Sequence, residues 1–136
     1  MKIKNFELVK IVNTLNKYAT YKLPQKINFA ITKNSITLEP SAEVYTKALN
    51  NILRVYEPYA KKDENGLPIR LSTNLYDIDQ DHKEEYEAEL NELFQQEVEV
   101  ELCHVDFSVF DYEDGDKYDA LSPSEIVELK EVICDL

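Results

Sequence analysis

Apolar residues recur with helical spacing near the start of the chain. Leu8, Ile11, Val12 and Leu15 fall at i, i+3, i+4 and i+7, which places them on one face of a helix. Polar residues fill most of the remaining positions. The pattern predicts an amphipathic helix from about residue 5 to 18, with Asn5 as its N-cap.

A longer pattern occupies residues 24–61 and allows two interpretations. Ile27, Phe29 and Ile31 alternate, as do Ile36 and Leu38, which is typical of a β-hairpin. Ten positions instead follow steps of four and three, the spacing of a helical packing seam. These positions are Ile27, Ile31, Asn34, Leu38, Ser41, Tyr45, Ala48, Ile52, Val55 and Tyr59. The longer match outweighs the shorter one and predicts a helix that begins near Pro24.

Pro40 lies inside this predicted helix. An interior proline removes one backbone hydrogen bond and clashes with the preceding turn. An unbroken helix over residues 24–61 would be roughly 57 Å long at about 1.5 Å per residue. We therefore expect either a long kinked helix or a helical hairpin that folds back at Pro40.

The second half mixes signals for strands and helices. Asn65-Gly66 is a strong turn signal, and a helix is expected over about 80–95. Residues 98–109 alternate as a strand does, with a bulge near Leu102. Ser122 and Glu125 have the spacing of a capping box that opens a last helix. The predicted fold class is therefore α+β, with the long element at about 24–61, an N-terminal helix, a small antiparallel sheet and a C-terminal helix.

Length and charge shape the expected organisation. The 136 residues fit a single domain over 1–136. Residues 1–62 hold 11 Lys and Arg against 4 acids, and residues 63–136 hold 4 against 23, so the formal charges are +7 and −19. A basic helical half and an acidic α+β half indicate an interaction surface. The halves could also neutralise each other within one fold or across a dimer.

The sequence offers little catalytic or cofactor chemistry. Its two glycines, Gly66 and Gly115, cannot build the glycine-rich loops that cradle phosphates. Cys103 and Cys134 follow no disulfide or metal spacing. We expect no enzyme activity, no cofactor, no bound metal and no direct nucleic-acid binding. The N-terminus lacks a signal-peptide pattern and no run of 18 apolar residues occurs, which predicts a cytoplasmic protein that does not enter a membrane.

Exposed acids are the strongest candidates for a partner-binding site. Alternate glutamates line one face of the predicted strand, and more carboxylates follow in a loop. The predicted partner-binding residues are Glu97, Glu99, Glu101, Asp106, Asp111, Glu113, Asp114 and Asp116. Such a row can attract the basic groove of a nucleic-acid-binding protein. The same row would also keep an outer strand soluble.

The helical seam suggests a second surface. Tyr45, Ile52, Val55 and Tyr59 lie on it, and tyrosine provides a large contact area with few rotatable bonds. We expect these residues to support self-association into a homodimer. Packing at the rim of the protein's own core would use the same residues equally well.

Several short motifs resemble a known protein family. The motifs are Leu23-Pro24-Gln25-Lys26, Phe29, Lys33-Asn34, Leu38-Glu39, Tyr59, Lys62-Asp63-Glu64-Asn65-Gly66, Glu89-Leu90-Asn91-Glu92-Leu93, Glu97-Val98-Glu99-Val100 and Leu121-Ser122-Pro123. Together they resemble a small family encoded by tailed phages and prophages of Gram-positive bacteria. The resemblance implies a phage origin and a helix over 24–61, from which Pro40 departs. It transfers no activity and no catalytic residue.

Three functional interpretations follow. The acidic half favours a non-enzymatic phage accessory protein that binds and inhibits a host protein, such as a basic nucleic-acid-processing or defence enzyme, in the bacterial cytoplasm. The long seam favours a virion or tail-assembly accessory protein or a chaperone. An enzyme acting on a small molecule is the weakest interpretation, because the residues for its chemistry are missing.

Overall fold

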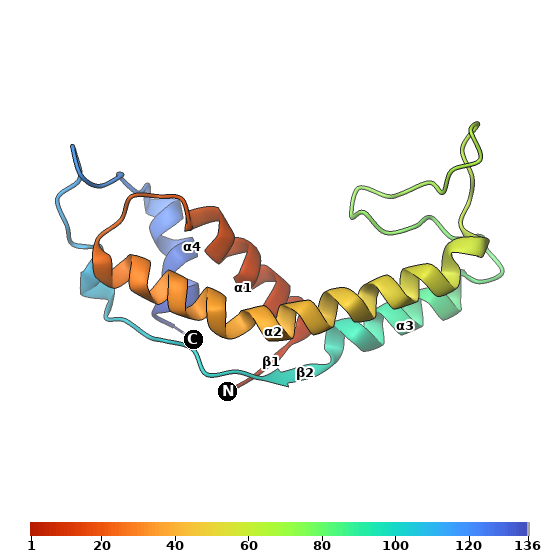
Figure 1. Cartoon of the computed structure of the whole chain (residues 1–136), viewed down its shortest axis with the longest axis horizontal. Coiled ribbons are helices and arrows are strands. Elements are labelled where there is room, and N and C mark those ends of the chain that lie inside the picture. The colour runs from red at the N-terminus through yellow and green to blue at the C-terminus, as the bar shows by residue number, and fades with distance from the viewer. Residues whose placement is uncertain (136) are drawn as a thin grey trace. The chain divides into compact units, whose positions relative to one another are not determined.

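The computed structural model describes residues 1–135, which form an α+β fold that is mostly helical (Figure 1). This confirms the predicted fold class. The elements in chain order are β1 (Lys2–Lys4), α1 (Asn5–Tyr18), α2 (Gln25–Tyr56), the 3₁₀ helix η1 (Glu57–Tyr59), α3 (Lys83–Gln95), β2 (Glu97–Glu99), the 3₁₀ helix η2 (Phe107–Phe110) and α4 (Pro123–Ile133).

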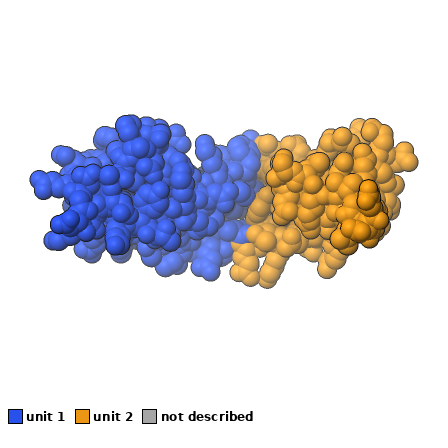
Figure 2. Space-filling view, turned by 90° about the horizontal axis from the view of Figure 1, so that it is seen from above, with its two compact units in different colours: residues 1–42, 97–136 blue, residues 43–96 orange. Residues whose placement is uncertain are grey.

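The chain divides into two compact units (Figure 2). Unit 1 comprises Met1–Ala42 and Glu97–Leu136, and unit 2 comprises Glu43–Gln96. Helix α2 contributes its first part to unit 1 and its last part to unit 2. The units therefore do not follow the basic and acidic halves of the sequence.

Helix α1 occupies the predicted range. Leu8, Ile11 and Leu15 are buried, as their spacing requires. The predicted N-cap was wrong by one residue, because Lys4 is the N-cap and Asn5 is the first helical residue. The backbone N–H of Lys4 donates to the Glu7 carboxylate at 3.2 Å, which stabilises the start of the helix.

Helix α2 confirms the helical interpretation of the seam, although the buried face changes along it. Ile27, Ile31 and Leu38 are buried, whereas Val55 near the other end is exposed. A straight helix has 3.6 residues per turn, so a stripe repeating every 3.5 residues drifts around it. Beyond Tyr45 the inward positions are Leu49, Leu53 and Tyr56.

Pro40 lies within α2, and the helix continues through it. The helical hairpin considered from the sequence does not form. Proline lacks the N–H that would bond the carbonyl of Ile36. Pro40 is exposed, so water can satisfy that carbonyl and the loss of one bond is tolerated.

Unit 1 packs α1 and α4 beside a two-stranded antiparallel sheet. In this sheet Ile3 of β1 lies opposite Val98 of β2. Helix α4 begins with the predicted capping box, in which the Ser122 hydroxyl accepts from the Glu125 N–H at 3.2 Å. Leu129 and Ile133 of α4 are fully buried in the core of this unit.

The chain after β2 differs from the predicted strand over 98–109. Strand β2 ends at Glu99, and Val100 then bonds to Met1: its N–H donates to the Met1 carbonyl at 2.9 Å and its carbonyl accepts from the Met1 ammonium at 3.1 Å. A buried side chain then takes over the pairing. The Asn34 amide accepts from the Cys103 N–H at 2.6 Å and donates to the Cys103 carbonyl at 3.0 Å and the Val132 carbonyl at 3.4 Å. Asn34 therefore holds this segment as a neighbouring strand would.

Unit 2 contains an unusual ring of backbone hydrogen bonds. Lys61 N–H donates to the Asp77 carbonyl at 2.8 Å, Asp77 N–H to the Ile69 carbonyl at 3.0 Å, and Ile69 N–H to the Lys61 carbonyl at 2.8 Å. Three extended segments thus close on one another, joined by turns at Gly66 and Asn74, which both have positive φ. Residues 67–71 form one of these segments.

The core of unit 2 lies between α2, α3 and these segments. Its buried members are Leu53, Tyr56, Ala60, Tyr76, Ile78, Tyr86 and Leu90. The Tyr86 hydroxyl accepts from the buried Tyr76 N–H at 3.2 Å. Burial raises the pKa of Tyr86, so the hydroxyl stays protonated. The hydroxyl thereby ties α3 to the third extended segment.

Candidate protein-binding surfaces

All eight predicted partner-binding acids are exposed in unit 1. Glu97 and Glu99 lie on β2, and Glu101 follows it. Asp106 is the N-cap of η2, where its carboxylate accepts from the Ser108 N–H at 3.0 Å. The acids after η2 lie in a loop of their own.

Glu99 is the least available of the eight. Its carboxylate lies 2.8 Å from the N-terminal ammonium of Met1. A hydrogen bond from that ammonium and its charge hold the pKa of Glu99 below its usual range. None of the other seven acids forms an ion pair with a residue in the described range 1–135.

Residues 111–119 form an ordered acidic loop. The Tyr112 hydroxyl donates to the Asp119 carbonyl at 2.6 Å, and the Tyr112 and Tyr118 rings meet edge to face with centroids 5.8 Å apart. Asp119 exchanges hydrogen bonds with the Lys22 backbone: its N–H donates at 2.7 Å and its carboxylate accepts at 2.8 Å. These contacts tie the loop to the segment that precedes α2.

The loop holds four carboxylates outward. Asp111, Glu113, Asp114 and Asp116 are exposed. Burial of the Tyr112 hydroxyl, and next the charges of Asp114 and Asp119, raise the pKa of Tyr112. The tyrosine therefore stays protonated and remains a donor to the loop backbone.

The fold redistributes the charge asymmetry of the sequence. Unit 1 contains 9 basic and 15 acidic residues, and unit 2 contains 6 basic and 12 acidic residues. Each unit therefore has a formal charge of −6. Each unit combines residues from the basic half and from the acidic half, so both units have a net negative charge.

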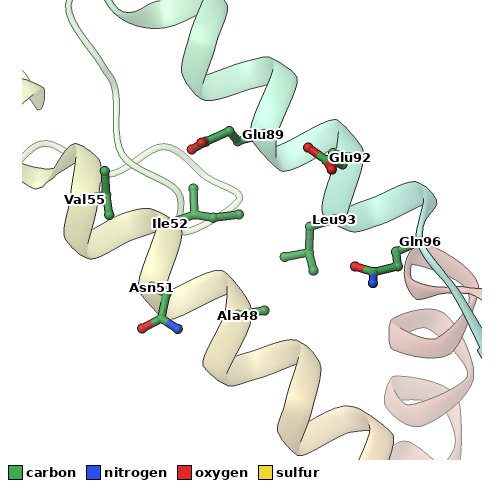
Figure 3. Close-up of a pocket in the computed structure, with 8 residues that line it drawn as sticks. All are labelled: Ala48, Asn51, Ile52, Val55, Glu89, Glu92, Leu93 and Gln96. Carbon is green, nitrogen blue, oxygen red and sulfur yellow. The ribbon is translucent and has the colours of Figure 1, made fainter.

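Unit 2 has a groove between α2 and α3, with a cavity volume of about 400 Å³ (Figure 3). Ile52 from α2 and Leu93 from α3 point into the space between the helices. The unit 2 groove is lined by Ala48, Asn51, Ile52, Val55, Glu89, Glu92, Leu93 and Gln96. Its floor is apolar, and the α3 side carries carboxylates.

The four predicted self-association residues separate into two pairs. Ile52 and Val55 line the unit 2 groove. Tyr45 packs against Phe94 with ring centroids 6.4 Å apart, and Tyr59 stacks on His82 at 3.7 Å. The two tyrosines and Ile52 thus pack within unit 2 itself, while Val55 is exposed at the groove.

Sequence reasoning missed a cluster at the start of α3. The Asp79 carboxylate lies 2.7 Å from Nδ1 of His82 and accepts from the His82 N–H at 3.0 Å. The side-chain bond to His82 is the main cause that lowers the pKa of Asp79. Asp79 and His82 are three residues apart immediately before α3, and this spacing is the sequence signal that could have indicated their contact. The Tyr59 ring covers the imidazole face, so the cluster fastens η1 to α3.

Cys103 and Cys134 are free thiols, and burial raises the pKa of Cys134. Within residues 1–135, no group of three His, Cys, Asp or Glu side chains is placed to hold a metal ion. None of the described helices is both long and apolar enough to cross a membrane.

No family model, curated protein or solved structure matches the chain.

Proposed function

We propose that this chain is a non-enzymatic phage accessory protein that binds a basic host protein in the bacterial cytoplasm. The observation that supports this is the ordered acidic loop at 111–119. Its four outward carboxylates have no cationic partner among residues 1–135, and hydrogen bonds at its base fix the backbone that carries them.

Preorganisation is what distinguishes this loop from a solvated acidic tail. A flexible tail loses conformational entropy when it binds, whereas an ordered loop loses little. Clustered carboxylates also attract a positively charged groove over a Debye length of about 8 Å at physiological salt. A nucleic-acid-binding enzyme offers such a groove, and occupying it would inhibit the enzyme.

The remaining predicted acids extend this surface to different degrees. Glu97, Glu101 and Asp106 are exposed in the same unit, whereas Glu99 is engaged by Met1. We therefore assign the main binding role to Asp111, Glu113, Asp114 and Asp116. Glu99 contributes to the fold of unit 1 more than to the partner.

A charge-matched pair of variants tests the proposal. D111N/E113Q/D114N/D116N neutralises the loop, and E64Q/D81N/E84Q/E87Q removes four exposed acids from unit 2. Proteins captured from bacterial lysate by the unchanged chain are identified, and the purified partner is titrated against both variants. We expect the loop variant to bind at least about tenfold more weakly, which is about 1.4 kcal/mol.

The salt dependence of binding and the identity of the captured protein test the proposal further. Binding should weaken as salt is raised from 0.05 to about 0.5 M, because added ions screen exposed charges. Equal affinity of the two variants would refute the acidic-loop proposal. Capture of phage tail proteins in place of a host protein would instead support the virion-assembly interpretation.

A further inference from the structure

The first part of α2 presents an exposed basic face. Lys26, Phe29, Lys33 and Ile36 follow steps of three, four and three, so they share one side of the helix. Phe29 is 57% exposed and Ile36 is 63% exposed. The Lys33 ammonium lies 5.9 Å from the centre of the Phe29 ring. We call these four residues of unit 1 the basic face.

The unit 2 groove has the opposite character. On α2, Ala48 and Val55 line the groove, and Val55 is 61% exposed. Val44, which is 68% exposed, continues the same stripe beyond the groove. On α3, Glu89 and Glu92 line the groove. Glu85 lies one turn before Glu89 on the same face and extends this stripe beyond the groove, and all three glutamates are exposed. The groove thus has an apolar stripe along one helix and an acidic stripe along the other.

The two surfaces also match in spacing. Phe29 and Ile36 are seven residues apart, as are Ala48 and Val55, which corresponds to about 10.5 Å along a helix. Lys26 and Lys33 repeat over the same distance, as do Glu85 and Glu92. A helix carrying the basic face can therefore set its apolar residues on the groove floor while its lysines meet the acidic stripe.

We propose that the basic face of one copy of this chain packs into the unit 2 groove of a second copy. Pairing groove with groove would bring two acidic stripes together, and pairing face with face would bring lysines together. Like charges placed opposite each other are unfavourable. Only the pairing of the basic face with the groove covers Phe29, Ile36 and Val55 and also brings opposite charges together. This surface is separate from the acidic loop, so it does not depend on the proposed function.

Charge reversal tests both sides of the interface. E85K/E92K alters the groove, and K26E/K33E alters the basic face. The unchanged chain is measured by analytical ultracentrifugation at roughly 5 to 500 µM, a range in which association with a micromolar dissociation constant changes the average mass. We expect a concentration-dependent rise in mass that either variant alone abolishes. An equimolar mixture of the two variants should associate again, because an acidic face then meets a basic groove.

Matched controls separate this pairing from a general charge effect. E84K/E87K changes the charge of α3 by the same amount as E85K/E92K but lies off the groove. K10E/K117E changes the charge of unit 1 by the same amount as K26E/K33E, at two exposed lysines outside the basic face. Both controls should associate as the unchanged chain does. Circular dichroism checks folding, and E85Q/E92Q with K26Q/K33Q replaces any reversed variant that does not fold. A monomer at every concentration, association that survives both reversals, or a mixture that stays monomeric would each overturn the proposal.

Discussion

The two units hold irregular chain segments in different ways. In unit 1 a buried side chain holds the segment after β2, since the Asn34 amide pairs with both backbone groups of Cys103. One backbone bond, from the Val105 N–H to the Ile133 carbonyl at 2.9 Å, adds to it. In unit 2 the segments around Lys61, Ile69 and Asp77 bond to one another through their own backbones. One arrangement has a side-chain amide at its centre, and the other has backbone groups of three segments that bond to one another.

This difference has consequences for tolerance to substitution. A hydrogen bond made by a side chain is lost when that residue changes, and the buried groups left behind are then unsatisfied. A backbone ring survives most substitutions, and only changes in the surrounding core disturb it. We therefore expect unit 1 to have one highly sensitive polar position, and unit 2 to have several moderately sensitive positions in its core.

The largest expected effect is that of Asn34→Ala. The change leaves the N–H and carbonyl of Cys103 without their partner in a part-buried site, and each unsatisfied buried group costs about 1–3 kcal/mol. We expect unfolding free energy to fall by about 3 kcal/mol. Urea unfolding followed by amide NMR signals in each unit measures the loss and shows that unit 1 loses more.

Thr32→Ala is the matched control, because Thr32 is exposed on the same helix two residues away. Its effect should stay within about 0.5 kcal/mol. An equally small effect of Asn34→Ala would show that the amide does not hold the segment after β2.

A smaller effect is expected for Tyr86→Phe in unit 2. The substitution keeps the buried ring but removes the hydroxyl that accepts from the Tyr76 N–H. We expect a loss of about 1–2 kcal/mol, the cost of one unsatisfied buried donor. Tyr76→Phe is the control, because its hydroxyl meets only Arg70 at 3.4 Å. A Tyr86→Phe loss as large as that of Asn34→Ala would remove the contrast between the units.

The sequence predicted the helices better than the connections between them. Apolar residues every three or four positions are a local signal, and this signal located α1 and α2. The spacing of Ser122 and Glu125 is also local, and it located the capping box of α4. The alternation in 98–109 was also real, but a strand needs a neighbour, and among the described residues the pairing with the β1 segment ends at Val100, which bonds to Met1. The role of Asn34 was hidden, because its partner Cys103 lies 69 residues away.

The candidate surfaces were also predictable only where the sequence signal is local. Exposure of the acids follows from their polarity and needs no knowledge of the fold. Pairing of Glu99 with Met1 joins residues 98 positions apart, which no local pattern reveals. The drift of the seam around α2 placed Val55 at the open groove, and a strict heptad repeat did not anticipate that drift.

The smallest expected effect concerns acid sensitivity in the two units. A hydrogen bond from the Ser122 backbone, followed by one from Tyr21, lowers the pKa of Glu125 in unit 1. The bond to His82 lowers the pKa of Asp79 in unit 2. A carboxyl whose pKa is lower in the folded state stabilises the fold above its unfolded pKa, and this stabilisation is lost as pH falls through the folded pKa.

Both units should therefore lose stability below about pH 4–5, where unfolded carboxyls begin to bind protons. E125Q should flatten this acid dependence in unit 1 only, and D79N in unit 2 only. Urea midpoints measured by NMR between pH 3 and 7 resolve the two units, and E131Q, an exposed position on α4, is the control. If either variant flattened the acid dependence of both units equally, the two units would unfold as one body, and the contrast between them would not extend to their stability.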